Sequence, residues 1–73
     1  MKLPLLSPQE LIRILRKIGF EEIRQKGSHI YIKHPDGRST VVPVHSSVDI
    51  GRGLLNRILK EIKVDRKEFM NYL

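Results

Sequence analysis

The spacing of apolar residues changes at Gly19, and this change constrains the fold more than any other feature. Before Gly19 the apolar residues recur at steps of three and four, which is the period of a helix with one buried face. They are Leu11, Ile14, Leu15 and Ile18. Ser7-Pro8-Gln9-Glu10 precedes them as a capping box with proline at the first helical position. The sequence therefore predicts a helix over 8–18 that ends at Gly19.

After Gly19 the apolar and polar residues alternate with a period of two, which is typical of β-strands. This pattern predicts strands over 21–26 and 29–33 joined by Gly27-Ser28, with Ile23 pointing inward. In the second strand the two isoleucines are expected to face the helices. The opposite face then carries His29, Tyr31 and Lys33. We expect this polar face to form the floor of a site.

Residues 34–38 have the composition of a turn, because Pro35 presets its backbone and Gly37 tolerates positive φ. The run 39–42 then predicts a third strand that pairs back as a hairpin and ends at Pro43. A loop over 44–48 follows and carries His45. The expected sheet is therefore a three-stranded antiparallel meander.

A second long helix is predicted to open within residues 49–53, with Asp49 as its N-cap. Its apolar stripe consists of Leu54, Leu55, Ile58, Leu59 and Ile62. The Gly51-Arg52-Gly53 segment fits either a phosphate cradle or tight packing of helix on sheet. After it, Asp65-Arg66-Lys67-Glu68 predicts a short C-terminal helix, from which Phe69 and Tyr72 pack back on the domain.

Length and composition limit the protein to a few classes. The 73 residues suffice for a single domain over 1–73. Fourteen Lys and Arg against eight Asp and Glu give a formal charge of +6, which favours nucleic acid as partner, followed by an acidic protein. No stretch approaches the roughly 18 apolar residues of a membrane helix, and no signal peptide is evident, so we expect a cytoplasmic protein without membrane contact. The absence of cysteine excludes disulfides and thiolate chemistry, and we expect no metal site and no cofactor.

His29 is the leading candidate for chemistry. A histidine has an unperturbed pKa of about 6.5, so it can accept or donate a proton near neutral pH. It follows Gly27, which allows a ligand to come close, and Arg24, Lys26 and Lys33 flank it. This combination indicates an anionic substrate.

The predicted order of helix, three strands and helix in a small basic chain is that of the double-stranded-RNA-binding domain. Four motifs in series are more specific: Gly27-Ser28-His29, Pro35-Asp36-Gly37-Arg38, Val42-Pro43-Val44-His45, and residues 49–55 with Ile58-Leu59. In order and spacing they resemble the HicA family of toxins over about Ser7 to Asp65. The resemblance implies a ribosome-independent mRNA interferase with this fold, which cuts RNA when free and is inhibited by a HicB-like antitoxin.

The same resemblance assigns the catalytic role to His29, the histidine of the glycine–serine–histidine motif. RNA cleavage without metal needs a base for the 2′-hydroxyl proton, cations for the charged transition state and an acid for the departing oxygen. His29 can serve as the base or as the acid. The expected RNA-binding residues are Arg24, Lys26, Ser28, Lys33 and Arg38. Of the cations, Lys26, Arg24 and Arg38 are expected nearest to His29, and Tyr31 could bind a phosphate oxygen.

Several assignments stay open at this point. His45 is either a second catalytic group or a structural histidine, and His34 is expected to be exposed and idle. The residues also fit a non-catalytic RNA-binding module or a basic protein-interaction domain with an acidic partner. A small DNA-binding repressor is disfavoured, because sheet separates the two long helices.

Overall fold

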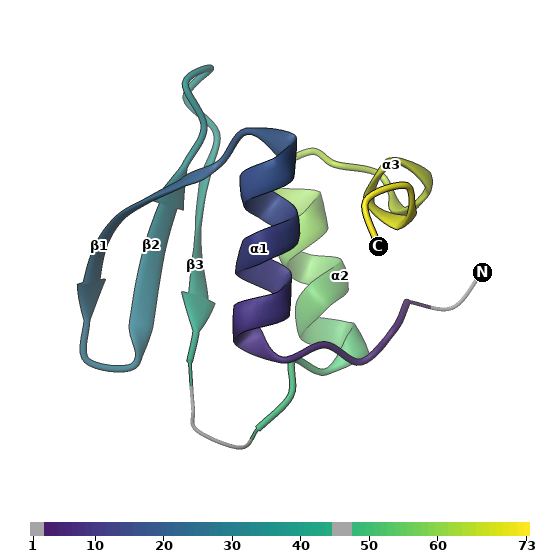
Figure 1. The fold of residues 1–73 in the computed structure, drawn as a ribbon, viewed down its shortest axis with the longest axis horizontal. Coiled ribbons are helices and arrows are strands. Elements are labelled where there is room, and N and C mark those ends of the chain that lie inside the picture. Colours follow the sequence, from purple (N-terminus) through teal and green to yellow (C-terminus); the bar gives the residue numbers. More distant parts are fainter. Residues whose placement is uncertain (1–2, 45–47) are drawn as a thin grey trace.

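The structure is a computed structural model that describes residues 3–44 and 48–73. Its elements follow the chain in this order: α1 (Pro8–Ile18), β1 (Glu21–Lys26), β2 (His29–Lys33), β3 (Ser39–Pro43), α2 (Arg52–Glu61) and α3 (Arg66–Met70) (Figure 1). The three strands form one antiparallel sheet in the order β1-β2-β3. The predicted α+β class, with a helix, a three-stranded antiparallel sheet, a helix and a short C-terminal helix, is confirmed.

α1 begins and ends where the sequence predicts. The Ser7 hydroxyl accepts a hydrogen bond from the Glu10 backbone N–H, and the Glu10 carboxylate accepts one from the Ser7 N–H, each at 3.1 Å. Hydrogen bonding to the carboxylate by the Ser7 backbone N–H, and then by the Ser7 side chain, lowers the pKa of the Glu10 carboxyl. At the other end Gly19 has a φ of 122°, a conformation that residues with a Cβ rarely adopt. The capping box and this glycine therefore fix both ends of α1.

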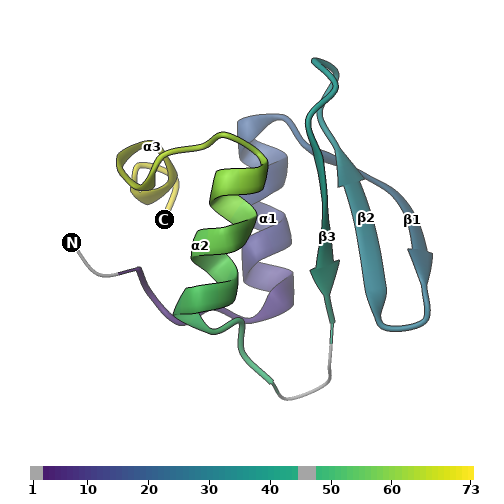
Figure 2. The same cartoon turned by 180° about the vertical axis from the view of Figure 1, so that it is seen from behind.

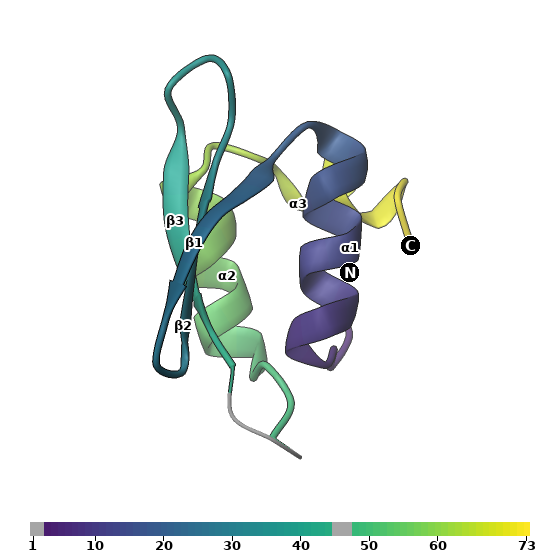
Figure 3. The ribbon, with the colours of Figure 1, turned by 60° about the vertical axis from the view of Figure 1, so that its left-hand side comes forward.

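Both long helices cover the same face of the sheet (Figures 1 and 3). The core lies between these two layers, because the sheet buries one apolar face and the helices bury one stripe each. Its most deeply buried side chains are Leu11, Leu15, Phe20, Ile32, Val42, Leu55, Leu59, Ile62 and Phe69. No described helix is long and apolar enough to cross a membrane.

β1 departs from the prediction at Ile23. The register between β1 and β2 shifts between Glu22 and Arg24, so one residue of β1 has no counterpart on β2. Such a bulge reverses the alternation of faces along the strand. The prediction that Ile23 points inward is therefore wrong, and 59% of its surface is exposed.

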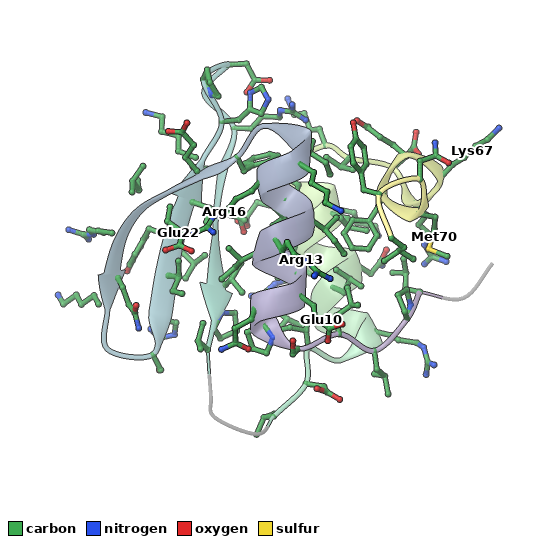
Figure 4. The ribbon with its side chains drawn as sticks, in the orientation of Figure 1. Glu10, Arg13, Arg16, Glu22, Lys67 and Met70 are labelled. Atoms are coloured by element: carbon green, nitrogen blue, oxygen red, sulfur yellow. The ribbon has the colours of Figure 1, made fainter. Side chains whose placement is uncertain are left out.

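The edge strand β1 is linked to the helix layer by charge rather than by apolar packing. Glu22 pairs in register with the buried Ile32, so it faces the helices. Figure 4 shows Arg16 of α1 and Glu22 close together, and one Arg16 Nη lies 2.6 Å from the carboxylate. All six residues of β1 are exposed, so this strand adds little to the core.

α2 begins later than predicted. Its N-cap is Gly51, which makes no side-chain cap bond, so the prediction of Asp49 as the N-cap is wrong. The cause is Ile50, which is buried, forms a β-bridge with Leu6 and donates its N–H to the Leu6 carbonyl at 2.6 Å. This bridge holds the backbone extended, so the helix cannot begin before Arg52.

The C-terminal segment folds as predicted. The Asp65 carboxylate accepts a hydrogen bond from the Glu68 N–H at 2.7 Å and so caps α3. Phe69 is fully buried and Tyr72 packs against the core. Figure 2 shows α3 beside α2, with the helices between it and the strands. α3 therefore closes the core on the side away from the sheet.

Candidate functional site

The sheet has an outer face, which is the face turned away from α1 and α2. It carries His29, Tyr31 and Lys33, because the residues between them, Ile30 and Ile32, are buried beneath the helices. The prediction that these three side chains share a face is confirmed. By register, the neighbouring strands add Glu21, Arg24, Lys26, Ser39, Val41 and Pro43 to this face.

His29 is the first residue of β2 and is exposed on the outer face. It follows the tight turn at Gly27, whose φ is 59°. Lys26 is its partner on β1 and Pro43 its partner on β3. Within residues 3–44 and 48–73, no hydrogen bond or ion pair engages the imidazole. Its ring nitrogens are therefore accessible to a ligand from solvent.

The backbone beneath His29 is held on both sides. The Lys26 pairing fixes it to β1, and the Val44 N–H donates to the Ser28 carbonyl at 2.6 Å, which prolongs the pairing with β3 by one residue. Ser28 itself is half-buried at this point. A histidine on so well paired a backbone is positioned before any ligand arrives.

Two of the predicted cations lie close to His29 along the sheet. Lys26 is directly across from it, and Arg24 is two residues further along β1. The Arg24 guanidinium lies 4.7 Å from the centre of the Tyr31 ring, a cation–π contact that keeps the charge on the outer face. Lys33 is at the far end of β2, roughly 13 Å from His29 at the usual rise of a strand.

Arg38 lies elsewhere. The prediction that it is near His29 is wrong, because the 34–38 turn and the 27–28 turn are at opposite ends of β2. Its Nε donates to Asp36 Oδ2 and its Nη1 to the Ile62 carbonyl, both at 2.8 Å. The guanidinium also lies 5.2 Å from the centre of the Phe20 ring. Arg38 therefore ties the β2–β3 turn to the end of α2, and an RNA-binding role for it stays an untested prediction.

His34 is a structural residue, so the prediction that it is exposed and idle is wrong. Its side chain is 21% exposed, and its Nδ1 accepts a hydrogen bond from the Asp36 N–H at 3.1 Å. Its ring meets Phe20 edge-on, with the two centres 5.0 Å apart. The sequence signal for this role was the spacing of His34 and Asp36, since a side-chain acceptor two residues before a backbone donor is a common turn device.

Asp36 completes this second cluster. Its carboxylate accepts the Arg38 N–H at 3.0 Å, and this bond, together with the Arg38 guanidinium, holds the pKa of the carboxyl below its ordinary value. The carboxylate also lies 3.0 Å from the His34 Nδ1. The Asp36 carboxylate and the Arg38 guanidinium are therefore engaged with each other at this end of the sheet.

A hollow of about 440 Å³ opens on the outer face beyond Tyr31, and sequence reasoning missed it. Its walls include Ile23, Tyr31, Val41, Lys33 and Glu61. Ile23 reaches it through the bulge in β1, which no alternation pattern reveals. Glu61 reaches it from the last residue of α2, which depends on tertiary packing.

The remaining predictions fall on other segments. His45 lies outside the described residues.

In the Gly51-Arg52-Gly53 segment, no described atom comes within 4 Å of a Cβ placed on either glycine, which contradicts tight packing at these positions. The Arg52 Nε instead donates to the Leu3 carbonyl at 2.6 Å. Within the described residues, no group of three or more His, Cys, Asp or Glu side chains gathers that could hold a metal ion.

The chemistry of the outer face follows from these positions. A solvent-accessible imidazole can transfer a proton near neutral pH. The cations Lys26 and Arg24 stand beside it and attract an anion, and no described carboxylate is paired with them. The arrangement is suited to binding a phosphate group and moving a proton next to it.

A family model described as "HicA toxin of bacterial toxin-antitoxin" matches residues 8–64. This span contains α1, the whole sheet and α2, and therefore His29 and the outer face. It ends before α3. A search of the curated proteins found no match.

Proposed function

Because this chain belongs to the HicA toxin family of bacterial toxin–antitoxin systems, we propose that it is a metal-independent endoribonuclease that cleaves mRNA. The observation that carries the proposal is His29, an accessible imidazole on a well-paired strand with Lys26 directly across from it. A toxin that acts on mRNA works where messages are translated, so the proposal includes a cytoplasmic location.

In the proposed reaction His29 is the proton-transfer group. Acting as the base, its imidazole takes the proton of an RNA 2′-hydroxyl, and the 2′-oxygen attacks the adjacent phosphorus. The bond from phosphorus to the 5′-oxygen breaks as the new bond forms, and the departing oxygen takes up a proton. The products are a 2′,3′-cyclic phosphate and a 5′-hydroxyl end.

The cations of the outer face stabilise the charge that develops on phosphorus. Lys26 is closest to His29 by register, and Arg24 is kept on the same face by Tyr31. Fixed positive groups aimed at a developing charge lower the barrier most where they are already in place. Ser28 and Lys33 extend this RNA-binding surface. His45 stays a candidate for the second proton-transfer group.

The partner proposed for this toxin is a HicB-like antitoxin. Membership of a toxin–antitoxin family implies an antitoxin. An inhibitor that covers His29 must also cover Lys26 and Arg24, so we expect it to present an acidic surface there. Charge reversal at Lys26 should then weaken the complex.

The test is the integrity of a long unstructured RNA incubated with purified protein in the presence of EDTA. We expect the wild type to shorten the RNA and His29→Ala to cut at least about 10²-fold more slowly, since one acid–base group contributes about 10²–10⁴ in rate. Gln9→Ala, an exposed change in the first turn of α1, is the control and should cut like the wild type.

Three other results would each overturn the proposal. If His29→Ala cuts as fast as the wild type, His29 is not a catalytic residue. If no variant cuts but all bind RNA with a steep dependence on salt, the chain is a non-catalytic RNA-binding module. Absence of RNA binding altogether would favour a basic protein-interaction domain.

A further inference from the structure

We propose that the hollow beyond Tyr31 binds one base of the RNA, next to the phosphate held at His29. The inference rests on the proposed function, because it takes RNA as the ligand. It adds a subsite to the outer face and predicts a preference among bases. The hollow holds about 440 Å³, within the roughly 300–1,000 Å³ typical of small-molecule pockets.

The walls of the hollow suit a flat, apolar ring. Ile23, Tyr31 and Val41 supply carbon surface from three different strands. The isoleucine is 59% exposed in a strand whose other residues are polar or charged, and the bulge is what turns it outward. Proteins that bind single-stranded RNA take unstacked bases onto aromatic side chains in this manner.

The distance from His29 fits a neighbouring base. Tyr31 is two residues along the same strand and face, which is roughly 7 Å at the usual rise. A nucleotide whose phosphate lies at His29 can therefore place its base over Tyr31. Arg24 covers part of the Tyr31 ring but does not line the hollow, so it remains available to the phosphate.

The rim of the hollow offers one donor and one acceptor. The Lys33 ammonium can donate to a base carbonyl, and the Glu61 carboxylate can accept from an exocyclic amino group. Neither forms an ion pair with a described residue, although Glu21 faces Lys33 across the strand pair. Cytosine and guanine carry both a carbonyl and an amino group, whereas uracil lacks the amino group and adenine the carbonyl. The subsite should therefore prefer cytosine or guanine.

RNA is favoured over a protein side chain as the occupant because of where the hollow opens. Its wall begins at Tyr31, two residues from His29 along β2, and the cations Arg24 and Lys33 lie on the same face as Tyr31. A protein segment bound here is the competing occupant, and the experiment below separates the two.

The first experiment measures binding without cleavage, using His29→Ala protein and the octanucleotides of cytidine and of uridine. We expect tighter binding of octacytidylate. Adding Tyr31→Ala should weaken that binding by about 5- to 150-fold, the range that 1–3 kcal/mol of base stacking gives. Adding Ile23→Ser should weaken it less. Leu73→Ser, an equally exposed apolar change at the C-terminus, is the matched control and should have no effect.

The second experiment maps where the protein with an intact His29 cuts a mixed-sequence RNA. We expect one position beside the cut to be enriched in cytosine or guanine. Glu61→Lys replaces the acceptor with a donor, so it should move the preference at that position toward uracil. Unchanged far-ultraviolet circular dichroism of each variant confirms that the fold is kept.

The outcomes separate this inference from the proposed function. If RNA is cut in a His29-dependent manner but cut sites show no base preference and Tyr31→Ala binds like the control, the base subsite is wrong while the nuclease stands. If Tyr31→Ala and Ile23→Ser keep full RNA affinity but lose an antitoxin, the hollow is a protein-docking site and the inference is overturned. If no RNA is bound or cut by any variant, the proposed function fails and the subsite fails with it.

Discussion

The two histidines at the ends of β2 differ in every property that decides what an imidazole can do. His29 opens the strand on the outer face, exposed and without a described hydrogen-bond partner. His34 follows the strand directly, half-buried, with its Nδ1 bonded to the Asp36 N–H and its ring against Phe20. Only five positions separate them, but His34 lies beyond the end of β2, in the turn that leads to β3.

The difference shows that the surroundings, rather than the residue type, assign the role. A ring whose nitrogen and edges are already engaged would have to give up those contacts to meet a substrate. A ring without such contacts gives up only its surrounding water when it meets a substrate. The His29 end of the sheet is therefore suited to binding and chemistry, and the His34 end holds the β2–β3 turn against the helices.

The largest expected effect is the loss of RNA cleavage on substitution of His29, without a matching loss of stability. His29→Ala should reduce RNA cleavage at least about 10²-fold and leave the free energy of unfolding within about 0.5 kcal/mol of wild type, as is usual for an exposed site. His34→Ala should keep the cleavage rate within a few-fold while the protein is folded. Cleavage assays and urea titrations on both variants measure the two quantities. Loss of cleavage in folded His34→Ala protein would contradict the assignment of a purely structural role to His34.

A substitution at Gly19 should lower stability through its contact with His34 and leave the His29 end of the sheet unaffected. A Cβ there would lie 2.7 Å from His34 Nε2, and the φ of 122° is strained for any residue with a Cβ. We expect Gly19→Ala to cost about 2–4 kcal/mol of unfolding free energy, as the sum of backbone strain and overpacking. Urea titration measures this loss.

The double variant Gly19→Ala/His34→Ala isolates the contact between the two positions. Removing the imidazole relieves the overpacking but not the backbone strain. The stability loss of the double variant should therefore be smaller than the sum of the two single losses by about 1 kcal/mol or more. Simple additivity would mean that the ring does not limit the space at Gly19. Gly37→Ala is a useful control, because it has a positive φ but no described atom near the added Cβ.

His34→Ala itself should have a smaller cost. The substitution removes the acceptor of the Asp36 N–H and the edge contact with Phe20, but the site is partly open to water. We expect a loss of about 1–2 kcal/mol, within the range for a lost hydrogen bond and ring contact. His34→Asn can still accept the Asp36 N–H, so it should recover part of this loss in the same urea titration. Equal stability of wild type and His34→Ala would show that the contacts are incidental.

The sequence predicted the fold more completely than the site. The capping box at Ser7, the glycine stop at Gly19 and the alternation of β2 are local signals, and each element they indicate is present. Asp49 failed as a cap because Ile50 is held by a bridge to Leu6, which is distant in sequence. Ile23 failed because a one-residue bulge leaves no trace in composition.

The site depends on which residues lie close together in the folded chain, and a sequence pattern predicts this only in part. His29 and its shared face with Tyr31 and Lys33 followed from a period of two, and this grouping is confirmed. Arg38 was expected beside His29 from the predicted hairpin layout, but the observed hairpin puts it at the opposite end of the sheet. There Asp36 and the Ile62 carbonyl bind its guanidinium. The catalytic and RNA-binding roles themselves stay predictions.

The smallest expected effect is the pH dependence of the His34 end, through Asp36. Its pKa lies below the ordinary 3.8 because the Arg38 backbone N–H and guanidinium favour the carboxylate. A depressed folded-state pKa means that the carboxylate contributes stability above the unfolded value, and this contribution is lost as the pH falls through the folded value. Asp36→Asn lacks the contribution at every pH. The stability difference between wild type and Asp36→Asn should therefore shrink as urea titrations move from pH 5 to pH 2.

The matched control for that titration is Asp49→Asn, since Asp49 is exposed and has no hydrogen bond to a described residue. It removes one exposed carboxylate without breaking a described hydrogen bond, so its difference from wild type gives the baseline over the same pH range. A difference for Asp36→Asn that follows this baseline would mean that Arg38 holds the turn without help from the charge of Asp36. The His34 end would then be held by ring packing and neutral hydrogen bonds alone, whereas the His29 end carries the cations Lys26 and Arg24.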